Sequence, residues 1–348
     1  MITRTRQEIV MSETRVTGGF RHGDLFQISP NYPDAPIFEW LMGHHPFLLE
    51  YRYSIPEISE TISNPDLPEP ELSALLDDEC SDKVKKWILL VLSMFSRSRV
   101  FQYGRHPNQE RWFIERPCNT KDLEVSPTPQ WGYPGYRYQG AVARIVDDFS
   151  HPDNVSIRLV DTHQYYCAET PRTYVIGQTP HNFELPDRIS SLIDPYVSLP
   201  DESRACFLSA CFLFDQGVEL FHQTPSLAFA ACVCSLETLI AADHKGQDEE
   251  HCKDCGQVMY KVRQKFLEFI ERYGNDSPET RNISDKVYSH RSKILHEGQL
   301  FLGETEPRTI EAADEWLKDD HQRRDVIRFF RACIINWLIG RPNEQSTP

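Results

Sequence analysis

The feature that most constrains the fold is an apolar segment at residues 225–242, which reads PSLAFAACVCSLETLIAA. Apolar side chains occur around nearly the whole circumference of a helix built from it. A helix of that kind belongs in the interior of a helical assembly. Thr224-Pro225 predicts where it starts, because proline is tolerated at the first helical position. The sequence therefore predicts a central, buried helix with other helices packed around it.

A second informative segment is residues 286–298, which reads KVYSHRSKILHEG. Its apolar residues recur at helical spacing, and Gly298 lies where a left-handed residue commonly ends a helix. Near this end, Arg291 and His296 are separated by four residues. The segment therefore predicts the last turns of a helix that carries an arginine and a histidine.

The order of these segments resembles the HEPN superfamily, and within it the Apea-like HEPN proteins. SLAFAACVCSLETLI is followed by a polar loop, a third helix and then VYSHRSKILHEG. The superfamily's ribonuclease motif is Arg, four to six residues, His, which Arg291 and His296 match. The resemblance covers roughly residues 200–340. It implies a helical bundle, a homodimer and metal-independent RNA cleavage through the 2′-hydroxyl, in prokaryotic antiviral defence or a toxin-like role.

The two residue types suit that chemistry. Histidine has an ordinary pKa of about 6.5, so His296 can accept or donate a proton near neutral pH. Arginine stays charged and presents a planar fork to phosphate oxygens. Arg291 would stabilise the charge that develops when the 2′-oxygen attacks phosphorus. DNA lacks this hydroxyl, so the reaction would select RNA.

The spacing of the motif poses a geometric problem. Residues five apart on an ideal α-helix point about 140° away from each other. Arg291 and His296 would meet only if the long arginine reaches across or the helix loosens before Gly298. Transphosphorylation also needs both a base and an acid. We therefore expect a C2 homodimer through the helical domain, which brings two copies of the motif to one cleft.

Three further residues are candidates for supporting roles. Glu237 is an acid within the apolar segment, and a buried acid usually has a partner. It either orients Arg291 or makes a structural hydrogen bond. Lys293 either contacts phosphate or is solvated, and Ser292 directly follows the arginine.

Residues 196–348 are predicted to form this HEPN-like all-α domain, after a proline-bearing junction at residues 185–200. Its last helix offers four arginines for a local basic cleft: Arg323, Arg324, Arg328 and Arg331. The predicted helices besides the two described above are Ser203–His222, Gln257–Tyr273, a short one within 308–319, and Asp320–Ile339.

The loop between the second and third helices contains the sequence HCKDCG. Cys252 and Cys255 have the spacing of half a zinc site, and four ligands are required. His251 and His244 are the nearest additional candidates, and a second half-site could come from a dimer partner. The alternative is a pair of free thiols. Zinc would be structural, and catalysis needs no cofactor.

Residues 1–195 are predicted to form a mixed α/β domain with an antiparallel sheet, which gives an α+β chain. The first residues look flexible, and Ser81 is the expected N-cap of a helix that ends at Phe95. Turn signals separate short β-like runs. The predicted strands are Phe47–Tyr53, Arg99–Tyr103, Arg111–Glu115, Ala141–Val146, Val155–Val160, Tyr165–Ala168 and Thr173–Ile176. The role of this domain is unknown, and detecting a trigger or restraining the nuclease would suit it.

Charge supports an alternative function. The 348-residue chain has a formal net charge of −15, which argues against broad nucleic-acid binding. A non-catalytic HEPN module that binds RNA, a nucleotide or a protein partner would fit that balance. No P-loop, dinucleotide fingerprint or nucleophile elbow occurs in the sequence, so ATPase, dehydrogenase and serine-hydrolase functions are set aside.

The sequence also predicts a soluble, cytoplasmic protein. Residues 1–19 lack the apolar core of a signal peptide. The longest apolar run, Trp87–Phe95, is far shorter than the roughly 20 residues that span a bilayer. The ten cysteines are accordingly expected to be reduced thiols.

Overall fold

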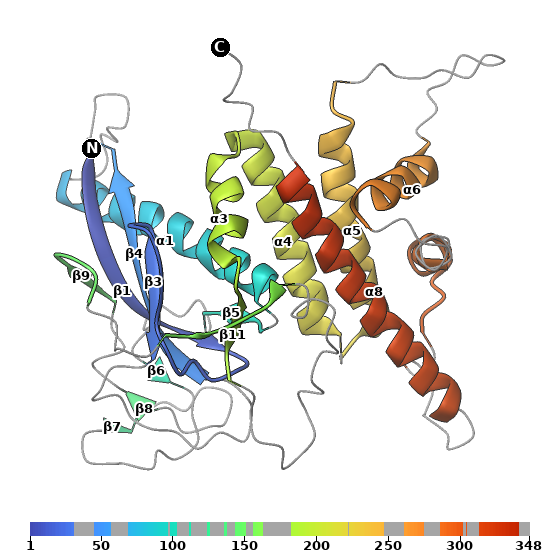
Figure 1. The fold of residues 1–348 in the computed structure, drawn as a ribbon, viewed down its shortest axis with the longest axis horizontal. Coiled ribbons are helices and arrows are strands. Elements are labelled where there is room, and N and C mark those ends of the chain that lie inside the picture. Colours follow the sequence, from blue (N-terminus) through green and yellow to red (C-terminus); the bar gives the residue numbers. More distant parts are fainter. Residues whose placement is uncertain are drawn as a thin grey trace. The chain divides into compact units, whose positions relative to one another are not determined.

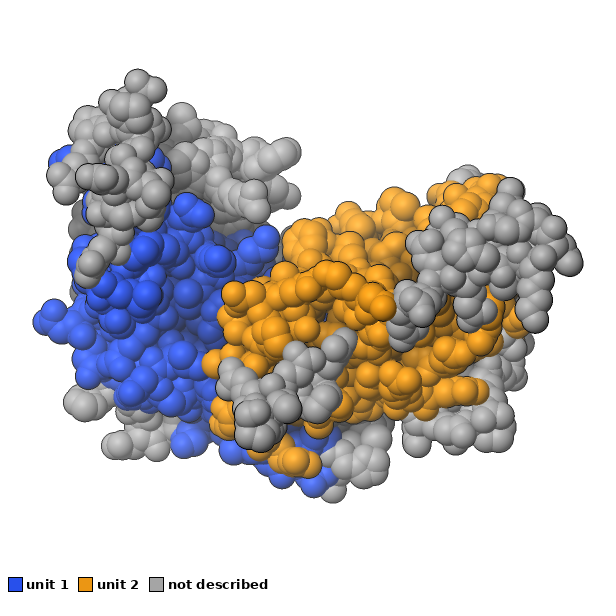
Figure 2. All heavy atoms as spheres, turned by 90° about the horizontal axis from the view of Figure 1, so that it is seen from above, with its two compact units in different colours: residues 1–187 blue, residues 188–348 orange. Residues whose placement is uncertain are grey.

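The computed structural model describes residues 1–30, 45–56, 69–96, 98–102, 111–112, 124–125, 136–137, 143–150, 156–162, 182–221, 223–246, 261–274, 286–301, 304 and 313–340. These residues combine helices with an antiparallel sheet (Figure 1), so the predicted α+β class is confirmed. The chain divides into two compact units, Met1–Asp187 and Arg188–Pro348, which Figure 2 shows in separate colours.

Unit 1 is built on a six-stranded sheet in which all neighbouring strands are antiparallel. Their order is β2-β3-β4-β1-β5, and β9 also pairs with β1. The strands are β1 (Ile2–Ser12), β2 (Phe20–His22), β3 (Phe26–Pro30), β4 (His45–Ile55), β5 (Val100–Phe101) and β9 (Arg144–Val146).

The flexible start predicted for the chain is wrong. Ile2–Ser12 forms β1, which pairs with β4 along its full length, from Ile2 opposite Ile55 to Ser12 opposite His45. Its charged residues conceal the strand in the sequence, because charge usually indicates exposure. Here Glu8 is buried and is matched by partners from other elements.

Shorter strands complete unit 1. β6 (Arg111–Trp112), β7 (Glu124–Val125) and β8 (Tyr136–Arg137) form a three-stranded sheet, and β10 (Arg158–Val160) pairs in parallel with β11 (Glu184–Pro186). Strands therefore occur within the predicted runs at 99–103, 111–115, 141–146 and 155–160. The runs predicted at 165–168 and 173–176 lie outside the described residues.

A long helix, α1 (Glu69–Phe95), packs on β4 and β5. It begins well before Ser81, so the prediction that Ser81 is its N-cap is wrong. Ser81 is fully buried in the middle of the helix, where its hydroxyl hydrogen-bonds the Tyr51 hydroxyl over 2.7 Å. Ser81 therefore makes a tertiary hydrogen bond to the sheet and does not cap the helix.

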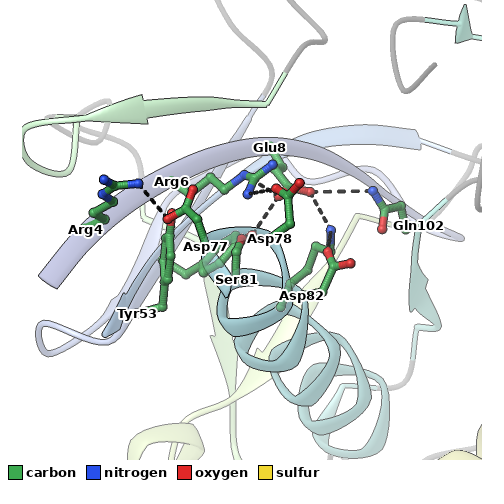
Figure 3. Close-up of polar contacts among 11 residues, drawn as sticks. Arg4, Arg6, Glu8, Tyr53, Asp77, Asp78, Ser81, Asp82 and Gln102 are labelled. Atoms are coloured by element: carbon green, nitrogen blue, oxygen red, sulfur yellow. Dashed lines mark hydrogen bonds and ion pairs between the residues drawn. The ribbon is translucent and has the colours of Figure 1, made fainter. Parts of the chain in front are cut away.

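A buried polar network joins α1 to the sheet (Figure 3). Lys85 Nζ lies 2.9 Å from Glu8 Oε2, and these side chains are only 6% and 2% exposed. The Tyr51 hydroxyl donates to Glu8 Oε1 at 2.6 Å, and Arg6 Nε lies 3.1 Å from the same oxygen. Burial and the adjacent carboxylate raise the pKa of Tyr51, so its hydroxyl remains a donor. Both oxygens of the Glu8 carboxylate therefore have a partner, Lys85 for Oε2 and Tyr51 with Arg6 for Oε1.

All described elements of unit 2 are helical. They are α3 (Ile189–Ser198), α4 (Asp201–Leu220), α5 (Pro225–Asp243), α6 (Val262–Tyr273), an α-helical segment at 286–292 that continues into the π-helical turn η2 (Lys293–Glu297), and α8 (Ala313–Gly340). The two helices predicted after residue 308 are one. No glycine or proline interrupts α8, and its charged middle continues the helix.

The apolar segment forms α5, which starts at Pro225 as predicted. α5 contacts α4, α6, α8 and η2. At Gly217 of α4, a Cβ atom would lie 2.4 Å from Cys232 Sγ, so the approach of α4 to α5 requires glycine there. Among the described helices, α5 is the one that is long and apolar enough to cross a membrane. Buried core helices of this length and composition meet the same two criteria, and more than half of α5 is buried.

Asp243 joins three helices at the end of α5. Its carboxylate accepts a hydrogen bond from Trp337 Nε1 of α8 at 2.8 Å and from the Tyr273 hydroxyl of α6 at 3.0 Å. The Trp337 ring stacks on Phe207 of α4 with an interplanar angle of 7°. The end of the central helix is therefore fixed by polar as well as apolar contacts.

The Glu8–Lys85 pair generates a stability prediction. Removing one member of a buried ion pair leaves the other charge uncompensated, so we expect Lys85→Ala to lower the free energy of unfolding by about 3–5 kcal/mol. Lys83→Ala is the matched control, because Lys83 is an exposed residue of the same helix. Urea unfolding would compare the variants, and equal stabilities would contradict a structural role for the pair.

Candidate functional site

The motif helix lies against α5 and brings Arg291 to Glu237. Val287 and Ile294 are buried and fix the helix on the core of unit 2. Arg291 Nη2 donates a hydrogen bond to Glu237 Oε2 at 3.1 Å and lies 3.1 Å from Oε1. The two side chains are 19% and 23% exposed. This ion pair connects the central helix to the motif.

A π-helical turn brings His296 back to Arg291. The Gly298 N–H bonds to the Lys293 carbonyl, so the hydrogen bond spans five residues instead of four. This wider turn carries less rotation per residue than an α-helix, so residues five apart come closer to lying one above the other. Arg291 Nη1 and His296 Nε2 are consequently 3.3 Å apart. The 140° separation of an ideal helix does not apply here.

The three nitrogens of the Arg291 guanidinium lie in different surroundings, and Nε is buried. Nη2 is used by Glu237, Nη1 faces the exposed imidazole of His296, and Nε of Arg291 has no hydrogen-bond partner. The Nη1 edge, which lies beside the solvent-exposed imidazole, is therefore the part of the guanidinium that can hold an anion close enough to exchange a proton with His296.

Ser292 and Lys293 contribute less to this geometry. Ser292 is half-buried and Lys293 is exposed. Within the described residues, neither side chain hydrogen-bonds to Arg291 or His296. Lys293 participates through its backbone carbonyl, which closes the π turn.

Cys234 lies beside the ion pair, which the sequence analysis missed. It precedes Glu237 by one turn on α5 and is half-buried. Burial raises the pKa of its thiol, the Glu237 charge raises it further, and the Arg291 charge opposes both. The i, i+3 spacing of Cys234 and Glu237 was the available signal. Cys232 is fully buried, as expected of a core residue.

The predicted zinc ligands and the arginines of α8 are the remaining candidates. His251, Cys252 and Cys255 lie outside the described residues. His244 ends α5, where its N–H bonds to the Ile240 carbonyl at 3.1 Å. Among the residues the structure describes, no group of three metal-ligating side chains occurs. Of the four α8 arginines, Arg331 packs its guanidinium 5.3 Å above the Phe214 ring.

No protein-family model, curated protein or solved structure matches this chain.

The environment of Cys234 predicts its reactivity. The thiolate is the nucleophile, so a raised pKa slows alkylation at neutral pH and moves its onset to higher pH. Glu237→Gln removes a negative charge and should speed alkylation by iodoacetamide, whereas Arg291→Ala should slow it. Peptide mass spectrometry would follow Cys234. Slower alkylation in Glu237→Gln together with faster alkylation in Arg291→Ala would contradict this geometry.

Gly298 provides a test of the π turn. Its φ is +66°, and an added Cβ would meet nothing within 4 Å, so only backbone strain opposes substitution. Left-handed backbone disfavours alanine by roughly 1–2 kcal/mol, and asparagine by less. We expect Gly298→Ala to lower the free energy of unfolding by about 1 kcal/mol and Gly298→Asn to lower it less. An alanine variant as stable as wild type would argue against this turn.

Proposed function

We propose that the chain is a metal-independent endoribonuclease of HEPN type, with a role in prokaryotic antiviral defence or as a toxin. In this proposal, residues 196–348 are the HEPN-like helical domain and residues 1–195 a mixed domain that senses a trigger or restrains the nuclease. The protein acts on RNA in the cytoplasm. The observation that carries the proposal is the 3.3 Å approach of Arg291 Nη1 to His296 Nε2.

The reaction would use the RNA's own nucleophile. His296 takes the proton from a 2′-hydroxyl, whose oxygen then attacks the adjacent phosphorus. Arg291 donates hydrogen bonds to the phosphate oxygens as their negative charge increases. The bond from phosphorus to the 5′-oxygen breaks, and that oxygen receives a proton from the second His296 of a dimer. The products are a 2′,3′-cyclic phosphate and a 5′-hydroxyl.

A homodimer fits the surface next to the motif. Leu295 and Leu300 are 45% and 46% exposed, and Leu227 at the start of α5 is 55% exposed. Leu227 and Leu300 directly adjoin Ser226 and Phe301, which share a hydrogen bond of 2.8 Å. Exposed leucines grouped near a site are typical of an association surface.

A non-catalytic binding module is the second candidate, and one observation favours it. Glu237 neutralises Arg291 in the free site, which weakens its attraction for phosphate. The net charge of −15 opposes polyanion binding further. A module of this kind would bind RNA, a nucleotide or a protein partner without cleaving it.

Substitution of the motif separates the two candidates. Loss of a general acid–base group lowers a rate by about 10²–10⁴-fold, so His296→Ala and Arg291→Ala should each abolish measurable RNA cleavage in buffer containing EDTA. Arg291→Lys should also be impaired, because lysine lacks the planar fork. Cleavage of single-stranded RNA by the purified protein is the measurement.

Arg263→Ala is the control, since Arg263 is an exposed arginine of α6, outside the motif helix. It should cleave at the wild-type rate. Circular dichroism and sedimentation should be unchanged in all variants. Full activity in both motif variants would refute the catalytic assignment, and RNA binding without cleavage by wild type would favour the binding module.

The proposed homodimer can be tested separately by sedimentation. The protein should sediment at twice the chain mass of 40.5 kDa. Leu300→Glu and Leu227→Glu should shift it toward the monomer, because an added charge disfavours burial of this surface. Ile145→Glu alters a residue of unit 1 that is 54% exposed, and it should leave the dimer intact. A monomeric wild type would remove the second histidine from the mechanism.

A further inference from the structure

Three aromatic rings form a corner directly beside the motif. The rings of Phe229 and Phe301 are 5.5 Å apart at 89°, and His290 lies 5.8 Å from Phe301 at 78° and 6.4 Å from Phe229 at 75°. Phe229 is 3% exposed and forms the buried base of this corner. His290 and Phe301 are half-buried and reach the surface.

The corner is held in place by a polar anchor at the start of α5. Glu304 accepts hydrogen bonds from the Ser226 N–H at 3.1 Å and from the Phe301 N–H at 3.0 Å. The Phe301 N–H also donates to the Ser226 hydroxyl at 2.8 Å, and that hydroxyl donates to Glu304. The backbone of Phe301 is thereby fixed to the central helix, although it follows the motif in a non-helical segment.

We propose that Phe301, with His290 packed edge-on against it, forms a stacking platform for the nucleobase next to the scissile phosphate. This rests on the proposed ribonuclease function and adds the group that recognises a base. His290 directly precedes Arg291, so their Cα atoms are 3.8 Å apart. Side chains of successive helical residues point about 100° apart, so a base on this platform and its neighbouring phosphate on the guanidinium would occupy adjacent sides of the motif helix.

The chemistry of this corner suits single-stranded RNA. Proteins recognise unpaired RNA by stacking its bases on aromatic side chains beside a cation that holds the backbone. Stacking does not depend on net charge, so it supplies affinity in a chain whose charge is −15. A ring that is fixed before binding loses little conformational entropy when the base arrives. Purines stack more strongly than pyrimidines, so the platform favours a purine.

The test uses the full-length protein and fluorescein-labelled single-stranded oligoadenylate and oligouridylate. Loss of one base–aromatic stack weakens binding about 5- to 100-fold. Phe301→Ala should raise the KM for oligoadenylate cleavage by that factor, leave kcat nearly unchanged and reduce the preference for adenylate. Phe301→Tyr keeps the ring and should restore both properties.

Two controls separate stacking from folding. Phe301→Leu keeps apolar bulk without a ring and should behave as the alanine variant does while remaining fully folded. Phe212→Ala removes a 44% exposed ring from α4 and should change neither KM nor base preference. Binding is also measured by fluorescence anisotropy in the His296→Asn background, where cleavage cannot obscure it.

The outcomes distinguish the two proposals. Cleavage with wild-type KM and base preference in folded Phe301→Ala and Phe301→Leu overturns the platform and leaves the ribonuclease intact. Binding without cleavage by wild type, with affinity lost in Phe301→Ala, rejects the ribonuclease and supports the platform. A wild-type protein that neither binds nor cleaves these oligonucleotides overturns both.

Discussion

The ion pair between Glu237 and Arg291 is the contact on which the candidate site depends. Glu237 stands in the otherwise apolar helix α5, and a partly buried carboxylate there is costly without a partner. Arg291 supplies that partner over 3.1 Å and thereby fixes the motif helix on the core of unit 2. The ion pair that makes the burial of Glu237 favourable thus also positions the Arg291 guanidinium. The π turn then adds the imidazole of His296, because its five-residue hydrogen bond returns the chain toward Arg291.

The same pair limits what Arg291 can do before a ligand binds. Glu237 occupies Nη2 and offsets the charge, while Nε remains without a hydrogen-bond partner. An incoming phosphate would compete with Glu237 for the guanidinium, and the competition favours the phosphate most when its negative charge rises in the transition state. A site arranged in this way would bind the ground-state phosphate weakly and the more negatively charged transition state more strongly. Stacking on Phe301 would supply the ground-state affinity that the ion pair withholds.

The sequence predicted those parts of the structure that depend on local pattern. The central helix followed from its apolar circumference, and the C-terminal Gly298 of the motif followed from its backbone preference. The sequence did not predict features that depend on distant partners. β1 was missed because Glu8 is charged, and its contacts with Arg6, Lys85 and Tyr51 make its burial favourable. The sequence did not decide whether His296 approaches Arg291, since six residues do not distinguish an α turn from a π turn. Cys234 and Phe301 gain their positions from tertiary packing alone.

The chemistry of the cleaved RNA ends tests the central claim most directly, because it reports which oxygen attacked phosphorus. Mass spectrometry of the products of a defined single-stranded RNA is the measurement. For attack by the 2′-oxygen we expect a 2′,3′-cyclic phosphate on the upstream fragment and a 5′-hydroxyl on the downstream one, and no cleavage at a nucleotide that carries a 2′-deoxy sugar. A 3′-hydroxyl with a 5′-phosphate, or cleavage that proceeds at the 2′-deoxy position, would show that water attacked instead and would contradict the account.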